Sequence, residues 1–75
     1  MTPLTTEEFL DYLDQNETCY IYNFRDESAF KIIGEDAYFK KYKGQKEKPI
    51  EHTDEDLCQA YFFRITMTEE EYNQF

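Results

Sequence analysis

The sequence is short of the residues that mark many classes of protein. It contains no tryptophan or valine, and only two glycines, two prolines and two cysteines. So little glycine and proline argues against a low-complexity segment. No apolar run approaches the roughly 20 residues that span a bilayer, and the N-terminus lacks the basic and apolar parts of a signal peptide. We therefore expect a cytoplasmic protein whose thiols, Cys19 and Cys58, stay free and buried in strands.

Basic residues are also scarce. The chain carries 17 Asp and Glu against 8 Lys and Arg, a net charge of −9 in 75 residues. Five of the eight cations lie within residues 40–48, so the rest of the chain holds 16 acids and only three bases. Such an excess repels anionic membranes and bare nucleic acid, and we expect neither as a direct partner. It favours a partner that is itself basic.

Aromatic residues, in contrast, are abundant, with seven Tyr and seven Phe. Each can bury on the order of 150–250 Å², which helps a chain of this size to form a core despite its few aliphatic side chains. The chain is too apolar and aromatic to be disordered. We therefore predict a single folded domain covering residues 1–75.

Two helices are indicated by similar N-terminal sequences, LTTEEF at 4–9 and MTEEEY at 67–72. In each, a threonine precedes a glutamate by three residues, which is the pattern of a capping box. The pattern predicts helices over residues 6–15 and 69–75. The paired residues are Thr5 with Glu8, and Thr68 with Glu71.

The first of these helices is expected to be amphipathic. Its apolar face would contain Phe9, Leu10 and Leu13, with Tyr12 at the edge. Its opposite face would be acidic.

Side-chain alternation predicts strands. Residues 18–24 alternate, with an aromatic face formed by Tyr20, Tyr22 and Phe24. Residues 29–33 fit the returning strand of a hairpin. A short helix over 26–33 satisfies the same apolar spacing and stays open as an alternative.

The remaining segments complete an α+β arrangement. Residues 35–43 begin with acids and end with lysines, which suits a helix dipole. Residues 44–56 are expected to be a polar loop, and residues 57–67 alternate as the longest strand. The predicted fold is a three-stranded antiparallel sheet with helices packed mainly on one face. Its strands are 18–24, 29–33 and 57–67, and its helices are 6–15, 35–43 and 69–75.

No catalytic motif is evident. His52 is the only histidine, and a strand at Cys58 would point the thiol away from a loop imidazole. The segment of His52, Asp54 and Asp56 has neither the glycine of an EF-hand nor zinc-ligand spacing. We expect no catalytic residue, no metal site and no cofactor. Weak metal binding or an enzymatic site around His52 is kept as an alternative.

The lysines of residues 40–48 lie beside aromatic residues, as in a nucleic-acid-binding patch. The surrounding negative charge acts against that function within a Debye length of about 8 Å. We expect these lysines to pair with neighbouring acids or to orient a partner.

The acidic surface is then the main functional candidate. Carboxylates and tyrosines suit docking on a basic groove, where they replace phosphates and stacked bases. In this composition, though in no single motif, the chain resembles small acidic inhibitors of phages and mobile elements: DNA mimics, anti-restriction and anti-CRISPR proteins, and immunity proteins of nucleases. The resemblance implies inhibition of a nuclease or another nucleic-acid-binding protein in the host-cell cytoplasm. The predicted partner-binding residues are Glu7, Asp11, Tyr12, Asp14, Asp54, Glu55 and Asp56.

A structural role is the other alternative. The aromatic face of the first strand, formed by Tyr20, Tyr22 and Phe24, would then be buried in a homodimer or against another subunit.

Overall fold

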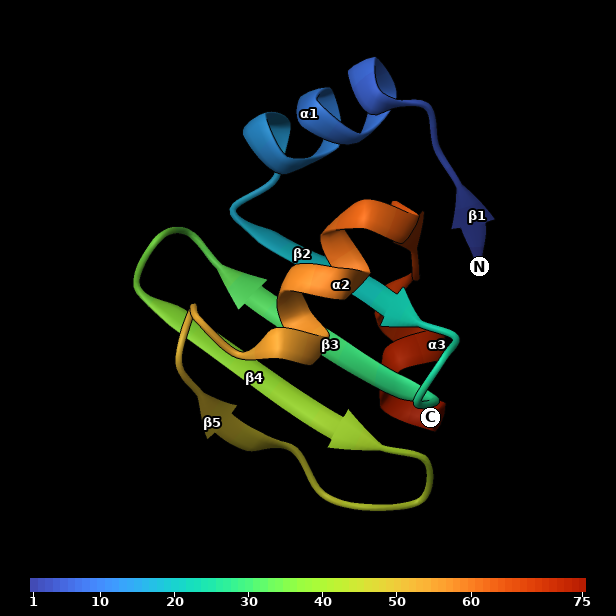
Figure 1. Ribbon diagram of the computed structural model, residues 1–75, viewed down its shortest axis with the longest axis vertical. Coiled ribbons are helices and arrows are strands. Elements are labelled where there is room, and N and C mark those ends of the chain that lie inside the picture. The colour runs from blue at the N-terminus through green and yellow to red at the C-terminus, as the bar shows by residue number, and fades with distance from the viewer.

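The computed structural model describes all 75 residues, as one antiparallel sheet with helices on both faces (Figure 1). Six strands are ordered β1-β6-β2-β3-β4-β5, and every neighbouring pair is antiparallel. The α+β class is right, but the predicted three-stranded sheet is wrong. The elements are β1 (Thr2–Pro3), α1 (Thr6–Gln15), β2 (Thr18–Asn23), β3 (Ser28–Ile33), β4 (Ala37–Tyr42), β5 (Lys48–Ile50), α2 (Glu55–Phe63), β6 (Ile65–Thr66) and α3 (Glu69–Gln74).

The helices lie on both faces of the sheet. In Figure 1, α2 lies in front of the sheet, α3 lies behind it and α1 lies above its upper end. The prediction that the helices pack mainly on one face is therefore wrong, because α3 joins a different core cluster from α1 and α2. The larger core cluster includes residues of α1, α2, β2 and β3: Phe9, Cys19, Ile21, Phe30, Ile32, Leu57 and Ala60. A smaller cluster, which includes Tyr72 of α3, joins Ala29, Met67 and Tyr72.

Both predicted capping boxes are confirmed. The Thr5 hydroxyl accepts a hydrogen bond from the Glu8 N–H, and the Glu8 carboxylate accepts one from the Thr5 N–H. Thr68 and Glu71 make the same pair of bonds at the start of α3. These bonds satisfy N–H groups that the first helical turn leaves free, so both helices begin where the sequence indicates.

The hairpin prediction is also confirmed. β2 and β3 pair along their whole length, from Thr18 opposite Ile33 to Asn23 opposite Ser28. β3 pairs with β4 on its other side. Its backbone groups are therefore used in two ladders, and the alternative helix over 26–33 is wrong.

The helix predicted at 35–43 is wrong, because this segment forms β4. Gly34 adopts a left-handed conformation (φ 56°), which glycine tolerates and which begins a three-residue turn from Ile33 to Ala37. The strand then pairs with both β3 and β5. Its aromatic residues favour a strand, and these pairings outweigh the favourable dipole arrangement of the acids and lysines.

The strand predicted at 57–67 is also wrong, because most of it forms α2. The Asp54 carboxylate accepts hydrogen bonds from the N–H groups of Asp56 and Leu57 and so caps the helix. Leu57 and Ala60, three residues apart, are fully buried against the sheet. The helix ends at Arg64, whose left-handed backbone (φ 53°) donates its N–H to the Ala60 carbonyl. Only Ile65 and Thr66 of the predicted strand belong to a strand, β6.

The predicted loop 44–56 contains β5 and the start of α2. β5 is one edge of the sheet and β1 is the other. Each contains a proline, Pro49 and Pro3, which lacks the N–H that another strand would need. Both edge strands are also short, and the edges are therefore poorly suited to pairing with a further chain.

Candidate protein-binding surface

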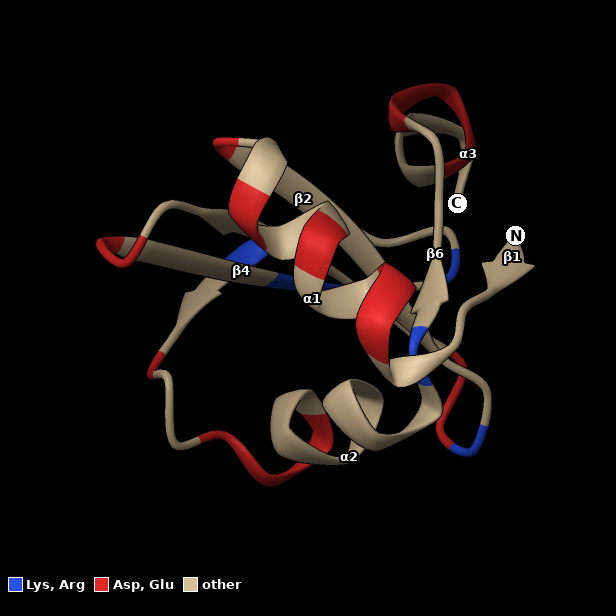
Figure 2. Cartoon of the chain, turned by 90° about the horizontal axis from the view of Figure 1, so that it is seen from above, with Lys and Arg blue, Asp and Glu red and all other residues tan.

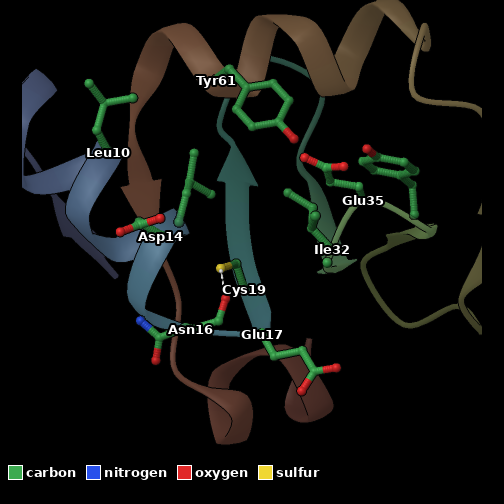
Figure 3. A pocket seen from close by; sticks show the side chains of 11 residues that line it. Leu10, Asp14, Asn16, Glu17, Cys19, Ile32, Glu35 and Tyr61 are labelled. Carbon is green, nitrogen blue, oxygen red and sulfur yellow. Dashed lines mark hydrogen bonds between the residues drawn. The ribbon is translucent and has the colours of Figure 1, made fainter.

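A furrow runs between α1 and α2 on the outer surface of the molecule. One end is an open hollow of about 440 Å³ and the other an open hollow of about 310 Å³. Leu10, Leu13 and Tyr61 line both, so the two hollows are neighbours. Figure 3 shows the larger one, with Leu10 and Asp14 on α1 and Tyr61 reaching over it from α2.

Two large apolar side chains on the furrow are exposed. Leu10 of α1 is 59% exposed and Phe62 of α2 is 79% exposed. Both line the smaller hollow, together with Phe9, Leu13 and Tyr61. Leu10 was expected on the buried face of its helix, but only Phe9 is buried. An exposed apolar patch of this kind marks a surface that another molecule can cover.

Acidic residues border the furrow. Glu7, Asp11 and Asp14, called the α1 acid row here, are exposed along the outward face of α1 (Figure 2). None of the three pairs with a cation of the chain. Asp14 lines the larger hollow with Glu17 and Glu35, and no lysine or arginine lines that hollow. The furrow therefore combines apolar side chains with uncompensated negative charge.

The acids predicted for partner binding at the start of α2 lie in a different setting. Asp54 and Asp56, with Asp26, surround the ammonium group of Lys40, whose side chain is only 5% exposed. Lys40 Nζ lies 2.5 Å from Asp56, 3.8 Å from Asp26 and 3.9 Å from Asp54. We call these four residues the Lys40 cluster. Glu55, in contrast, is exposed and makes no ion pair.

A buried amide supports the same end of α2. Asn23 Nδ2 donates hydrogen bonds to the Asp56 carbonyl at 2.9 Å and to Gln59 Oε1 at 3.1 Å. Asn23 is fully buried and lies on β2, so these bonds join the sheet to the first turn of the helix. The polar groups of the Lys40 cluster and Asn23 are thus used to hold α2 on the sheet.

The Lys40 cluster shifts the pKa values of its members. The hydrogen bond from Lys40 holds the pKa of Asp56 below its usual value. Burial raises the pKa of Asp26, against the effect of the hydrogen bond from Ser28. Burial lowers the pKa of Lys40, but hydrogen bonds to Asp56 and Tyr42 outweigh it and raise the value overall. Lys40 therefore stays charged, while the fold disfavours ionised Asp26.

Tyr12, also predicted to bind a partner, joins α1 to β2. Its hydroxyl oxygen accepts a hydrogen bond from the Tyr20 N–H at 2.9 Å and lies 3.4 Å from the Tyr20 carbonyl, to which it donates. The side chain is half-buried against the larger core cluster. Of the predicted residues, only Asp14 lines the furrow, and Glu7 and Asp11 are exposed elsewhere on α1. Tyr12, Asp54 and Asp56 are engaged within the fold.

The lysine segment is not one patch. Lys40 is buried in its cluster, and Lys41 Nζ donates to the Tyr72 carbonyl at 3.0 Å. Lys43, Lys46 and Lys48 are exposed and make no ion pair. The expected pairing with acids therefore occurs at Lys40 alone.

The alternative site around His52 contains one contact between its residues. The Cys58 thiol contacts the His52 carbonyl oxygen at 3.9 Å. No group of three or more His, Cys, Asp or Glu side chains is arranged to hold a metal ion.

The aromatic face proposed for a homodimer is largely covered within the chain. Tyr20 packs against Tyr72 with ring centroids 5.0 Å apart, and Tyr22 packs against Phe75 at 5.6 Å. Phe24 remains 54% exposed. α3 and the C-terminal residue therefore cover part of this face, at Tyr20 and Tyr22.

The sequence did not reveal the furrow. The sequence pattern predicts a strand at Phe62, whereas the structure places Phe62 on α2 with its side chain exposed. The signal that could have found it is the acidic start of α2 at residues 54–56, which is typical of a helix N-terminus.

The chain matches no protein-family model, no curated protein and no solved structure. None of the three helices has the length and apolar character needed to cross a membrane.

Proposed function

We propose that this protein is a non-enzymatic binding protein whose α1 acid row docks on a basic protein surface and blocks it. The observation that carries the proposal is that Glu7, Asp11 and Asp14 are exposed, aligned and without an internal cation. A basic partner would supply the missing counter-charges. The compartment we propose is the cytoplasm, where the free thiols Cys19 and Cys58 stay reduced.

The spacing of the row suits a surface that binds nucleic acid. Residues 7, 11 and 14 follow one helix face, with axial rises of about 6 and 4.5 Å between them. Phosphates along one DNA strand recur about every 3.4 Å of helix axis. The row thus offers carboxylates at a comparable linear density, and its target is a lysine- or arginine-rich groove that otherwise holds phosphates. Blocking of such a groove would inhibit a nuclease or a related enzyme.

The test is binding to a synthetic, unstructured Lys/Arg peptide, with affinity measured by titration at low and high salt. The variant Glu7→Gln/Asp11→Asn/Asp14→Asn should bind about tenfold more weakly, mainly through a slower on-rate. The matched control Glu51→Gln/Glu69→Gln/Glu70→Gln removes the same charge from other exposed positions. The affinity of this control for the peptide should fall by less than about threefold. Equal losses in both variants would show that only net charge matters, and the proposal would fail.

A further inference from the structure

We infer that the furrow between α1 and α2 receives the apolar side chains of a basic amphipathic helix from the partner. This inference rests on the proposed function, because it names the partner element that the α1 acid row attracts. The docked helix would add an apolar contact to the electrostatic contact made by the α1 acid row.

The exposed apolar side chains of the furrow favour an apolar occupant. Leu10 and Phe62 expose most of their surface at the smaller hollow. Covering these side chains would remove apolar surface from water, which favours binding. The one cation on that hollow, Arg64, is committed to the chain itself, since its guanidinium donates to the carbonyl oxygens of Leu4 and Phe62.

The length and surroundings of the furrow favour a helix. It follows α1 from Thr6 to the residues just beyond its end, Asn16 and Glu17. The ten residues of α1 span about 15 Å, which matches about three turns of a docked helix with anchors at i, i+3 or i+4, and i+7. Binding by strand addition would need a free sheet edge, and both edges carry a proline.

The charge around the furrow decides between a basic helix and a second copy of this chain. Asp14, Glu17 and Glu35 line the larger hollow, and Glu7 and Asp11 add further negative charge on α1. A symmetric dimer through this face would bring two such acidic borders together, at a net charge of −9 per copy. A lysine-rich helix would instead place its cations against these acids and its apolar stripe in the furrow.

The experiment uses two synthetic peptides of about 18 residues with the same Leu and Lys composition. One has an amphipathic helical order, and the other is scrambled so that no apolar face forms. The amphipathic peptide should bind at least about tenfold more tightly. Leu10→Ala/Phe62→Ala should remove that advantage without changing affinity for the scrambled peptide. The control Phe24→Ala, at an exposed site outside the furrow, should leave the tighter binding of the amphipathic peptide unchanged.

The native thiols give an independent readout. Cys58 is exposed and lines the smaller hollow, whereas Cys19 is only 2% exposed, so alkylation of the folded protein labels Cys58. The amphipathic peptide should slow that labelling at saturation by about tenfold or more.

The outcomes separate the inference from the proposed function. If both peptides bind equally, the electrostatic function stands and the furrow is not the site. If neither binds, the proposed function fails as well. A homodimer that disappears in Leu10→Ala/Phe62→Ala during sedimentation would assign the furrow to a second copy and overturn the inference.

Discussion

The α1 acid row and the Lys40 cluster each contain three carboxylates, yet they differ in every physical respect. Glu7, Asp11 and Asp14 are exposed and have no cation within the chain. The three aspartates of the cluster converge on one buried lysine. An acidic residue therefore has a structural role where a buried cation depends on it. An acidic residue on which no buried cation depends remains available to a partner.

The comparison also explains how the chain tolerates a charged residue inside its sheet. Lys40 stands opposite Phe30 on the face that α2 covers. A lone ammonium there would be costly, and the carboxylates that neutralise it belong to the hairpin turn and to the start of α2. The position of α2 and the ionisation of Lys40 are thus coupled.

Removing the cation should give the largest effect. Lys40→Met leaves three partly exposed carboxylates without their counter-charge, and we expect a loss of about 1–3 kcal/mol in the free energy of unfolding. Urea denaturation measures it. The control Lys43→Met, at an exposed lysine without an ion pair, should stay within about 0.5 kcal/mol. Adding Asp26→Asn and Asp56→Asn to Lys40→Met should restore part of the loss. Equal stability of the two Met variants would contradict the role given to the cluster.

The next largest effect on stability should distinguish Asp54 from its neighbour Glu55 at the start of α2. Asp54→Ala removes the cap that accepts two backbone hydrogen bonds, and it should cost about 1 kcal/mol. That loss lowers the melting temperature by roughly 4–8 °C in a domain of this size. Glu55→Ala, at an exposed neighbour, should change stability by less than about 0.5 kcal/mol. If Glu55→Ala were the more damaging variant in thermal unfolding, the assignment of the cap would be wrong.

The parts of the fold that the sequence predicted well are those decided by neighbouring residues. Thr5 with Glu8, and Thr68 with Glu71, specify helix starts through bonds that span three residues. The alternation in residues 18–23 specifies a strand in the same local way. Such signals need no knowledge of the rest of the chain.

The wrong predictions concern segments whose state is decided by distant contacts. Residues 37–42 became a strand because β3 and β5 pair with them and because Lys40 meets acids from elsewhere in the chain. Residues 57–63 alternate as a strand would, but Asp54 caps them and Leu57 and Ala60 pack as a helix face. The α1 acid row could be read from helical spacing alone, whereas the furrow depends on where α2 lies.

A smaller effect should show that two acids of the Lys40 cluster have opposite pH dependence. The pKa of Asp56 is lowered by Lys40, so its contribution to stability is full above the usual value near 3.8 and is lost as the pH falls. Burial raises the pKa of Asp26, so folding favours its neutral form and its ionisation costs stability as the pH rises above that value.

Variants at the two positions test this difference through unfolding measured between pH 3 and pH 7. Asp26→Asn should be more stable than the unmodified protein at pH 7, by up to about 1 kcal/mol, and equal to it near pH 3. Asp56→Asn should be less stable at pH 7, and its deficit should shrink on acidification. Asp36→Asn, at an exposed acid without an ion pair, serves as the control. Difference curves of the same sign for Asp26 and Asp56 would refute the assignment.

The smallest effect on stability belongs to the α1 acid row. Glu7→Gln/Asp11→Asn/Asp14→Asn should change the free energy of unfolding by no more than about 0.5 kcal/mol. Neutralising Glu7 in the first turn and Asp14 in the last turn has opposite helix-dipole effects, so the expected sign, a gain, comes from decreased self-repulsion. Denaturant unfolding and the peptide titration should therefore move in opposite directions, with stability kept or raised while affinity falls. A clear loss of stability would show that these acids support the fold, as Asp54 and Asp56 do. Acids that add no stability to the fold and form no ion pair within the chain are the arrangement expected of residues that serve a partner.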